Sequence, residues 1–251
     1  MRVDVAFLPS LVTRPERTVC VVVDVLRATS TLATLAGNGV REVVVVADLD
    51  RAFALRRAAE QAGVEPPLLC GEVGGLPPSG FDYGNSPAEF SRLDVGGRAV
   101  VLFTSNGTRA LMHVARSPGV FAGSLLNCSA SVEAALAAAR PAGLNVTFVC
   151  SGTDLGTAYC LEDAFCAGAL TVTLLDRAVE PVQLGDGAQT ALRLCRSFDG
   201  NALAAFAAAE HGALLPRIGL AADVDFCARQ DLYAVAPQAQ RRDGRVVVRT
   251  A

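Results

Sequence analysis

The chain has 251 residues, of which 51% are hydrophobic and 19% are charged, and its formal net charge is −3. This composition excludes an intrinsically disordered chain, because enough apolar surface is available to offset the entropy that folding removes. All of the positive side chains are arginines and they form no basic run, so we expect no nucleic-acid partner.

The pattern of apolar residues also argues against a membrane partner. A membrane-spanning helix needs roughly 18 apolar residues in a row, and the run 167–175 already contains two threonines. Arg2, Asp4 and Pro9 interrupt the first residues, which therefore do not resemble a secretory signal. The eight cysteines include no CxxC pair, a usage typical of core residues in a reducing compartment. We therefore expect a soluble, cytoplasmic protein.

Strand-like and helix-like segments alternate along most of the chain. Runs of β-branched residues predict strands, and helical spacing of apolar residues predicts the segments between them. We predict strands at 19–23, 42–47, 66–70, 98–103, 120–126 and 144–149, with helices at 28–35, 51–62 and 161–175 and others ending near 115 and 140. Beyond Asp176 we predict helices at 187–197 and 201–210, then β-like runs at 232–236 and 245–248.

This alternation predicts an α/β fold, specifically a three-layer α/β/α sandwich with a largely parallel or mixed sheet. The near-continuous valine runs indicate strands that are covered on both faces. No segment has the length and polarity of a linker, so we predict one domain over residues 1–251. Segment 176–251 is compatible either with an additional helical layer or with edge strands of the same sheet.

Polar residues follow the apolar runs at four or five strand ends, which is where open α/β sheets bind ligands. Asp24 follows the strand 19–23, and Arg27 comes three residues later. A carboxylate at that position is a good ligand for a hard cation, and a guanidinium is a good clamp for phosphate. The structural alternative is that Asp24 caps the next helix and Arg27 is its surface partner.

A second strand end is rich in small polar residues. Asn106, Gly107 and Thr108 separate a strand from a helix, and Arg109 follows them. Free backbone N–H groups at a helix start attract anions, so this segment is either an anion site or an ordinary turn with a helix cap.

Several acidic residues are further candidates. Glu72 lies in a glycine-rich segment that gives it no structural role. Glu162 and Asp163 stand near a helix start, where they either complement the helix dipole or face the site. Asp223 and Asp225 flank a valine and would point the same way if that stretch were extended.

Other patterns have a structural explanation that we prefer. Residues 86–89 form a capping box that would fix the preceding loop. Residues 48–50 imitate the nucleophile motif of haloacid dehalogenases, but Ala52 stands where that motif needs Thr or Val. His113 and His211 are isolated in the sequence, so a histidine-based mechanism is not indicated.

Taken in order, these segments resemble the 2-phosphosulfolactate phosphatase family. The resemblance runs through residues 24–30, 71–72, 80–87, 106–108, 161–163, 167–168 and 225–228, and it spans nearly the whole chain. Two positions depart from the family pattern, because Val73 stands where an arginine is frequent and Ser105 where a threonine is usual.

The resemblance implies a Mg²⁺-dependent phosphatase that hydrolyses 2-phosphosulfolactate to 3-sulfolactate and phosphate, as in coenzyme M biosynthesis. The implied catalytic residues are Asp24, Arg27 and Glu72. The implied Mg²⁺ ligands are drawn from Asp24, Glu72, Asp163 and Asp225. The implied substrate-binding residues are Asn85, Asn106, Gly107, Thr108, Arg109 and Cys128.

Two other functions remain open at this point. The same scaffold would serve a phosphatase of another small phosphorylated 2-hydroxy acid, or a non-catalytic module that binds phosphate esters without turnover. In each case the partner is a small phosphorylated acid, sulfonated or carboxylated, and a homo-oligomer is left open.

Overall fold

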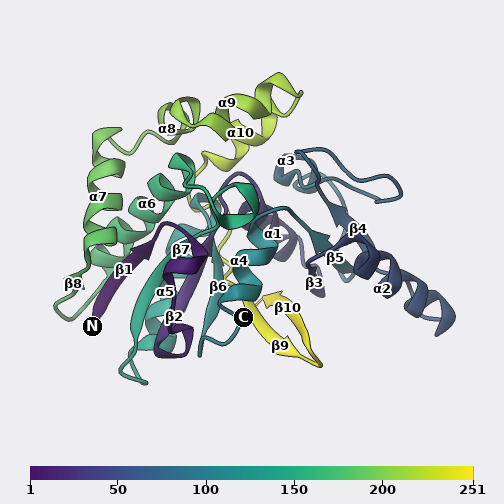
Figure 1. The fold of residues 1–251 in the computed structure, drawn as a ribbon, viewed down its shortest axis with the longest axis horizontal. Helices are drawn as coiled ribbons and strands as arrows, with labels where there is room; N and C mark the ends of the chain where they lie inside the picture. Colours follow the sequence, from purple (N-terminus) through teal and green to yellow (C-terminus); the bar gives the residue numbers. More distant parts are fainter. Residues whose placement is uncertain (251) are drawn as a thin grey trace.

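The computed structural model describes residues 1–250, and its centre is one ten-stranded sheet (Figure 1). The strands are β1 (Arg2–Ala6), β2 (Thr18–Val23), β3 (Glu42–Val46), β4 (Leu68–Gly71), β5 (Ala99–Phe103), β6 (Val120–Gly123), β7 (Asn145–Cys150), β8 (Gln183–Leu184), β9 (Pro237–Arg242) and β10 (Arg245–Thr250). Their order in the sheet is β4-β5-β3-β10-β9-β6-β2-β7-β1-β8.

Ten helices accompany the sheet within the described residues. They are α1 (Ala28–Gly37), α2 (Leu49–Gln61), α3 (Pro87–Phe90), α4 (Gly107–His113), α5 (Cys128–Ala139), α6 (Leu161–Arg177), α7 (Asp186–Ser197), α8 (Ala202–Ala208), α9 (Glu210–Arg217) and α10 (Ala221–Cys227). Short 3-10 turns lie at Pro9–Leu11, Pro15–Arg17, Leu125–Asn127 and Asp154–Gly156.

Two groups of parallel strands make up most of the sheet. One group is β4-β5-β3 and the other is β6-β2-β7-β1-β8. The antiparallel hairpin β9–β10 joins them, since β10 pairs with β3 and β9 pairs with β6. The predicted α/β sandwich with a mixed sheet is therefore confirmed.

Alternation along β2 explains the layers. Val19, Val21 and Val23 belong to the core beneath α5 and α6, whereas Cys20 and Val22 belong to the core beneath α1 and α4. On the smaller strand group, α2 covers the face that α1 and α4 leave free. Helices therefore cover both faces of the strands, which is what the valine-rich runs predicted.

Segment 176–251 contains both helices and strands of the same sheet. Its last residue, Ala251, lies outside the described residues. The hairpin β9–β10 occupies the middle of the sheet rather than an edge, and it begins at Pro237, after the stretch 232–236 that was predicted as strand. Within this segment only the two-residue β8 is an edge strand, while α7 lies at the left of Figure 1 and α8 to α10 lie along its top.

Some elements escaped the sequence analysis. Strand β1 was missed because its charged residues alternate with buried valines in a run of only five residues. The predicted helix 201–210 is two helices, because Ala209 is extended (φ −84°, ψ 142°) and Gly212 packs against the backbone oxygen of Phe206. The stretch around Asp223 and Asp225 is the helix α10, not extended chain.

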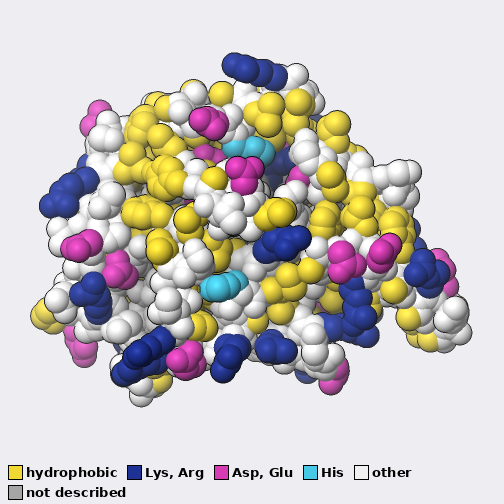
Figure 2. Space-filling model, viewed as in Figure 1, with side chains coloured by type: hydrophobic (Ala, Val, Ile, Leu, Met, Phe, Trp, Pro, Cys, Tyr) yellow, Lys and Arg dark blue, Asp and Glu magenta, His cyan; other side chains and the backbone are white. Residues whose placement is uncertain are grey.

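Positive and negative side chains are mixed on the surface, as the absence of a basic run in the sequence predicted. On the face drawn in Figure 2, arginine side chains alternate with acidic ones and with apolar areas instead of forming one basic field. Within residues 1–250, no helix combines the length and apolar character that a membrane crossing requires. All eight cysteines are buried with free thiols.

The contact between α6 and α7 depends on a glycine. A Cβ atom at Gly168 would lie 2.2 Å from the backbone oxygen of Ala191, which is too close for any side chain. Gly168→Ala would improve helix propensity but force the two helices apart, and overpacking of this kind costs about 1–3 kcal/mol. We expect a lower urea midpoint for Gly168→Ala, with Thr190→Ala on exposed α7 surface as the control. An unchanged or higher midpoint for Gly168→Ala would contradict this packing.

Candidate active site

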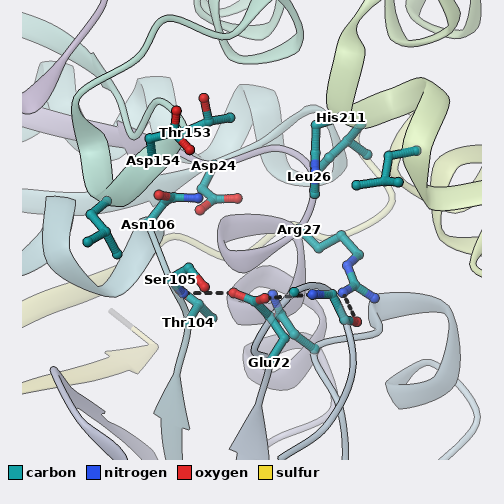
Figure 3. A pocket seen from close by; sticks show the side chains of 15 residues that line it. Asp24, Leu26, Arg27, Glu72, Thr104, Ser105, Asn106, Thr153, Asp154 and His211 are labelled. Carbon is teal, nitrogen blue, oxygen red and sulfur yellow. Dashed lines mark hydrogen bonds between the residues drawn. The ribbon is translucent and has the colours of Figure 1, made fainter. Parts of the chain in front are cut away.

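A pocket of about 340 Å³ opens where the ends of strands from both groups meet α9 (Figure 3). Its walls come from the segments that follow β2, β4, β5 and β7, together with two residues of α9. The lining residues are Asp24, Leu26, Arg27, Glu72, Gly74, Gly75, Asn85, Thr104, Ser105, Asn106, Thr153, Asp154, Leu155, His211 and Leu214. The sequence-predicted residues Asp24, Arg27, Glu72, Asn85 and Asn106 thus share one cavity.

Asp24 both caps a helix and faces the pocket. Its Oδ1 accepts a hydrogen bond from the backbone of Ala28 at 3.1 Å, at the start of α1. The other oxygen lies against Gly107, where a Cβ atom would be only 2.6 Å from Oδ2. Glycine is therefore required at 107 for the start of α4 to approach the carboxylate. Burial, reinforced by the nearby charge of Glu72, raises the pKa of Asp24.

Glu72 ties two strand ends together at the floor of the pocket. Its Oε1 accepts from the backbone N–H of Ser105 at 2.7 Å, and its Oε2 accepts from Gly75 at 2.9 Å (Figure 3). Each carboxylate oxygen has a further lone pair, so these bonds orient the group without exhausting it.

Two amide side chains face the same space with unused acceptors. The Oδ1 atoms of Asn85 and Asn106 are buried and have no hydrogen-bond partner. A buried polar atom without a partner is costly, so such an atom at a pocket wall points to a ligand.

Arg27 is the one arginine that lines the pocket among the described residues. Its guanidinium donates to Asp223 Oδ2 at 2.8 Å and to the carbonyl oxygen of Gly75 at 2.7 Å. Both members of the ion pair are almost completely buried, with side-chain exposures of 2% for Arg27 and 1% for Asp223. This burial fits Arg27 as a clamp for phosphate better than as a surface partner of Asp24.

Asp163 lies behind the pocket rather than in its wall. It accepts from the backbone of Val25 at 2.9 Å and from the hydroxyl of Ser151 at 3.0 Å, and so links the ends of β2 and β7. Burial raises its pKa well above the ordinary value. Its neighbour Glu162 is also buried, its Oε2 has no partner, and burial raises its pKa to about 7.

Three other predicted site residues lie elsewhere. Asp225 is exposed, because a helix, unlike a strand, turns residues two apart to different faces. Arg109 is exposed on α4 and does not line the pocket. Cys128 is fully buried in the core, with its thiol 3.1 Å from the hydroxyl of Thr173, and burial raises its pKa to about 12.

Gly107 and Thr108 shape the pocket without lining it. Thr108 is buried, and its hydroxyl donates to the carbonyl oxygen of Thr104 at 2.7 Å, while its backbone N–H donates to the Thr104 hydroxyl at 3.2 Å. These bonds fix the turn that carries Ser105 and Asn106, so the segment is a structured turn as well as part of the site.

Sequence reasoning missed His211. It lies on α9 and lines the pocket opposite the strand ends. Burial lowers its pKa, which favours the neutral imidazole. No motif in the sequence marks His211, because only the folding of α9 over the sheet brings it to the pocket.

The loop after β7 also contributes more than its polar composition indicated. Asp154 and Leu155 adopt left-handed backbone conformations, with φ of 49° and 61°, and Leu155 lines the pocket. Leu214 of α9 lines it as well, so the mouth of a polar cavity carries two partly exposed leucines.

The oxygen ligands in the pocket fit a magnesium ion. Among residues 1–250, no three His, Cys, Asp or Glu side chains gather closely enough to hold a metal ion, so at most two of the four candidate carboxylates could share one. Mg²⁺ usually binds one or two carboxylates and keeps water or substrate phosphate as its other ligands. Asp24, Glu72 and the unpartnered carbonyl oxygens of Asn85 and Asn106 suit that mode.

Comparisons with known proteins agree with the resemblance seen in the sequence. A probable 2-phosphosulfolactate phosphatase of Pseudothermotoga lettingae is 39% identical over 236 residues, covering 94% of each chain. One of Carboxydothermus hydrogenoformans is 33% identical and covers 100% of this chain and 98% of its own. One of Deinococcus radiodurans is 39% identical over 87% of this chain and 86% of its own.

These names indicate a phosphatase, which is a phosphoric monoester hydrolase. Residues 7–242 match the family described as 2-phosphosulpholactate phosphatase. The chain therefore belongs to the 2-phosphosulfolactate phosphatase family.

Proposed function

We propose that this protein hydrolyses 2-phosphosulfolactate to 3-sulfolactate and phosphate in a Mg²⁺-dependent reaction, as in coenzyme M biosynthesis. The observation that carries the proposal is the meeting of Asp24 and Arg27, from the segment after β2, with Glu72, from the segment after β4, in one pocket. Family membership supplies the reaction class, and the pocket supplies groups suited to it.

Charge balance supports the magnesium part of the proposal. Asp24, Glu72 and Asp154 line the pocket, and Arg27 is the guanidinium among its lining residues. A phosphate dianion would be repelled by these carboxylates unless a cation stood between them. Mg²⁺ held by Asp24 and Glu72 would neutralise charge on the phosphoryl oxygens.

The protein's own groups would then position the ester. Arg27 presents guanidinium N–H groups to the phosphoryl oxygens, because the side chain is fixed by Asp223 and Gly75. Asn85 and Asn106 extend amide groups into the same cavity. Hydrolysis breaks the ester P–O bond, forms one to a water oxygen, and leaves a proton on the departing alcohol. Holding these atoms and their charges in place accounts for most of the catalysis in phosphoryl transfer.

A second candidate keeps the reaction and changes the substrate to another small phosphorylated 2-hydroxy acid. It is favoured by the apolar contribution of Leu26, Leu155 and Leu214 to the wall, which offers no partner to a second strong anion. Val73, at the position where an arginine is frequent, is 55% exposed and adds no charge. Phosphate release from 2-phosphosulfolactate, compared with that from 2-phospholactate, separates the two substrates. The cytoplasmic location stays a prediction, and the oligomeric state stays open.

Removing the charge of Asp24 tests the proposed metal site. We expect wild-type protein to release phosphate from 2-phosphosulfolactate with Mg²⁺ and to stop when EDTA is added. Asp24→Asn should lower kcat/KM by about a hundredfold or more, because it removes a ligand and a charge from the reacting centre. Asp225→Asn, which neutralises an exposed carboxylate, should retain wild-type turnover. Turnover that is indifferent to EDTA would remove the metal from the proposal.

Burial of Glu162 leads to a prediction about how the stability of the metal-free protein depends on pH. The pKa of Glu162 is raised from 4.5 to about 7, so the folded protein holds this proton more tightly than the unfolded chain. That contribution is complete below pH 4.5 and is lost as pH rises through about 7. We therefore expect Glu162→Gln to gain stability over wild type as pH rises from about 5 to about 8, measured as the difference in urea midpoints.

Magnesium should oppose the loss of wild-type stability at higher pH, because metal binding requires deprotonated carboxylates. We expect Mg²⁺ to raise the wild-type midpoint more at about pH 8 than at about pH 5, with a smaller effect on Asp24→Asn. Equal Mg²⁺ effects on the two proteins at every pH would contradict a site at Asp24.

A further inference from the structure

Asp223 is a buried carboxylate whose two oxygens contact two different segments of the pocket. The sequence pattern paired it with Asp225, but α10 turns Asp225 outward and leaves Asp223 only 1% exposed. Asp223 belongs to the C-terminal helical layer and does not line the pocket itself. Its role must therefore be sought in the groups that it contacts.

The first contact fixes the guanidinium of Arg27. Asp223 Oδ2 accepts from Nη1 at 2.8 Å, and the carbonyl oxygen of Gly75 accepts from Nη2 at 2.7 Å. A guanidinium has five N–H groups in one plane. Two acceptors on different nitrogens set the orientation of that plane and leave the remaining N–H groups free for a ligand.

The second contact fixes the segment that carries Asn85 into the pocket. Asp223 Oδ1 accepts from the hydroxyl of Ser86 at 2.6 Å and from the backbone N–H of Ala88 at 3.2 Å. The Ser86 oxygen in turn caps α3 by accepting from the backbone of Glu89 at 3.1 Å. The Ser86 cap, which is the half of the predicted capping box that the structure shows, is thus anchored to α10, next to Asn85 with its unpartnered buried Oδ1.

We propose that Asp223 is a positioning residue, which holds Arg27 and the 85–88 segment in the arrangement that binds the phosphoryl group. This inference rests on the proposed function for the role of Arg27. The alternative is that Asp223 only stabilises the fold. A buried ion pair is poor evidence for stability, because desolvation of the two charges offsets much of their attraction. One oxygen of Asp223 contacts Arg27 and the other contacts the 85–88 segment, and this geometry favours a role in positioning both.

Asp223→Asn is the first test, because it preserves shape but places an amide opposite Arg27. We expect kcat/KM for 2-phosphosulfolactate to fall at least about tenfold, a loss within the range of coupling between contacting residues. The matched control is Asp225→Asn, two residues along the same helix and exposed, for which we expect less than about a twofold change. Wild-type kcat/KM in a folded Asp223→Asn protein would overturn the proposal.

Chemical rescue separates positioning from a purely structural role. In Arg27→Ala, added guanidinium ion should restore part of the lost turnover, because Asp223 and Gly75 still offer their acceptors. In the double variant Arg27→Ala/Asp223→Asn, guanidinium should restore much less. If Asp223 only stabilised the fold, its replacement would not change the binding of a free guanidinium ion. Equal rescue of Arg27→Ala and of the double variant would therefore contradict the proposal.

Measuring the binding of inorganic phosphate tests the role of Asp223 without requiring that the substrate be known. Inorganic phosphate is titrated calorimetrically, with Mg²⁺ present, into wild type, Asp223→Asn and Asp225→Asn. We expect weaker phosphate binding in Asp223→Asn alone, and equal affinities in the three proteins would overturn the inference. If wild type hydrolyses no ester but this difference persists, the proposed function fails while the positioning role stands. If Asp223→Asn does not fold, Asp223→Glu takes its place, because it keeps the charge but displaces Arg27 by one methylene.

Discussion

The burial of several carboxylates beside one another is the constraint on which this site depends. Asp24, Glu162 and Asp163 are nearly inaccessible to water, and burial raises the pKa of each. A protein tolerates such a cluster when hydrogen-bond donors, protons or a cation offset its charge. Backbone N–H groups do this for Asp163, whereas Asp24 keeps an oxygen against the glycine at 107. The proposed cation would complete that balance.

The same constraint explains why the pocket needs parts from the whole chain. Strand ends supply short, rigid attachment points for Asp24 and Glu72, because strands fixed in a sheet cannot move independently. Helices α9 and α10 come from much later in the sequence, and they bring His211 to the pocket and Asp223 to Arg27. The C-terminal helical layer is therefore part of the site and not a separate addition to the fold.

Local patterns predicted most of the secondary structure and many of the lining residues. The valine runs predicted strands covered on both faces, and polar residues at their ends predicted where ligands bind. Asp24 shows the limit of such patterns, since capping and pocket interpretations were offered as alternatives and the structure combines them. Cys128 shows another limit, because the resemblance implied a substrate-binding residue whereas its side chain is buried in the core, as the general use of cysteine in this chain indicated.

The sequence by itself determined the α/β class, the family and the positions of Asp24, Arg27 and Glu72 at or near strand ends, because these follow from local periodicity and ordered motifs. Only the tertiary structure decided that β9–β10 lies inside the sheet, that Asp223 rather than Asp225 pairs with Arg27, and that His211 reaches the pocket. Each of these depends on contacts between residues far apart in the chain. Such contacts are selected by packing and burial of the whole molecule, and no local pattern of residues records them.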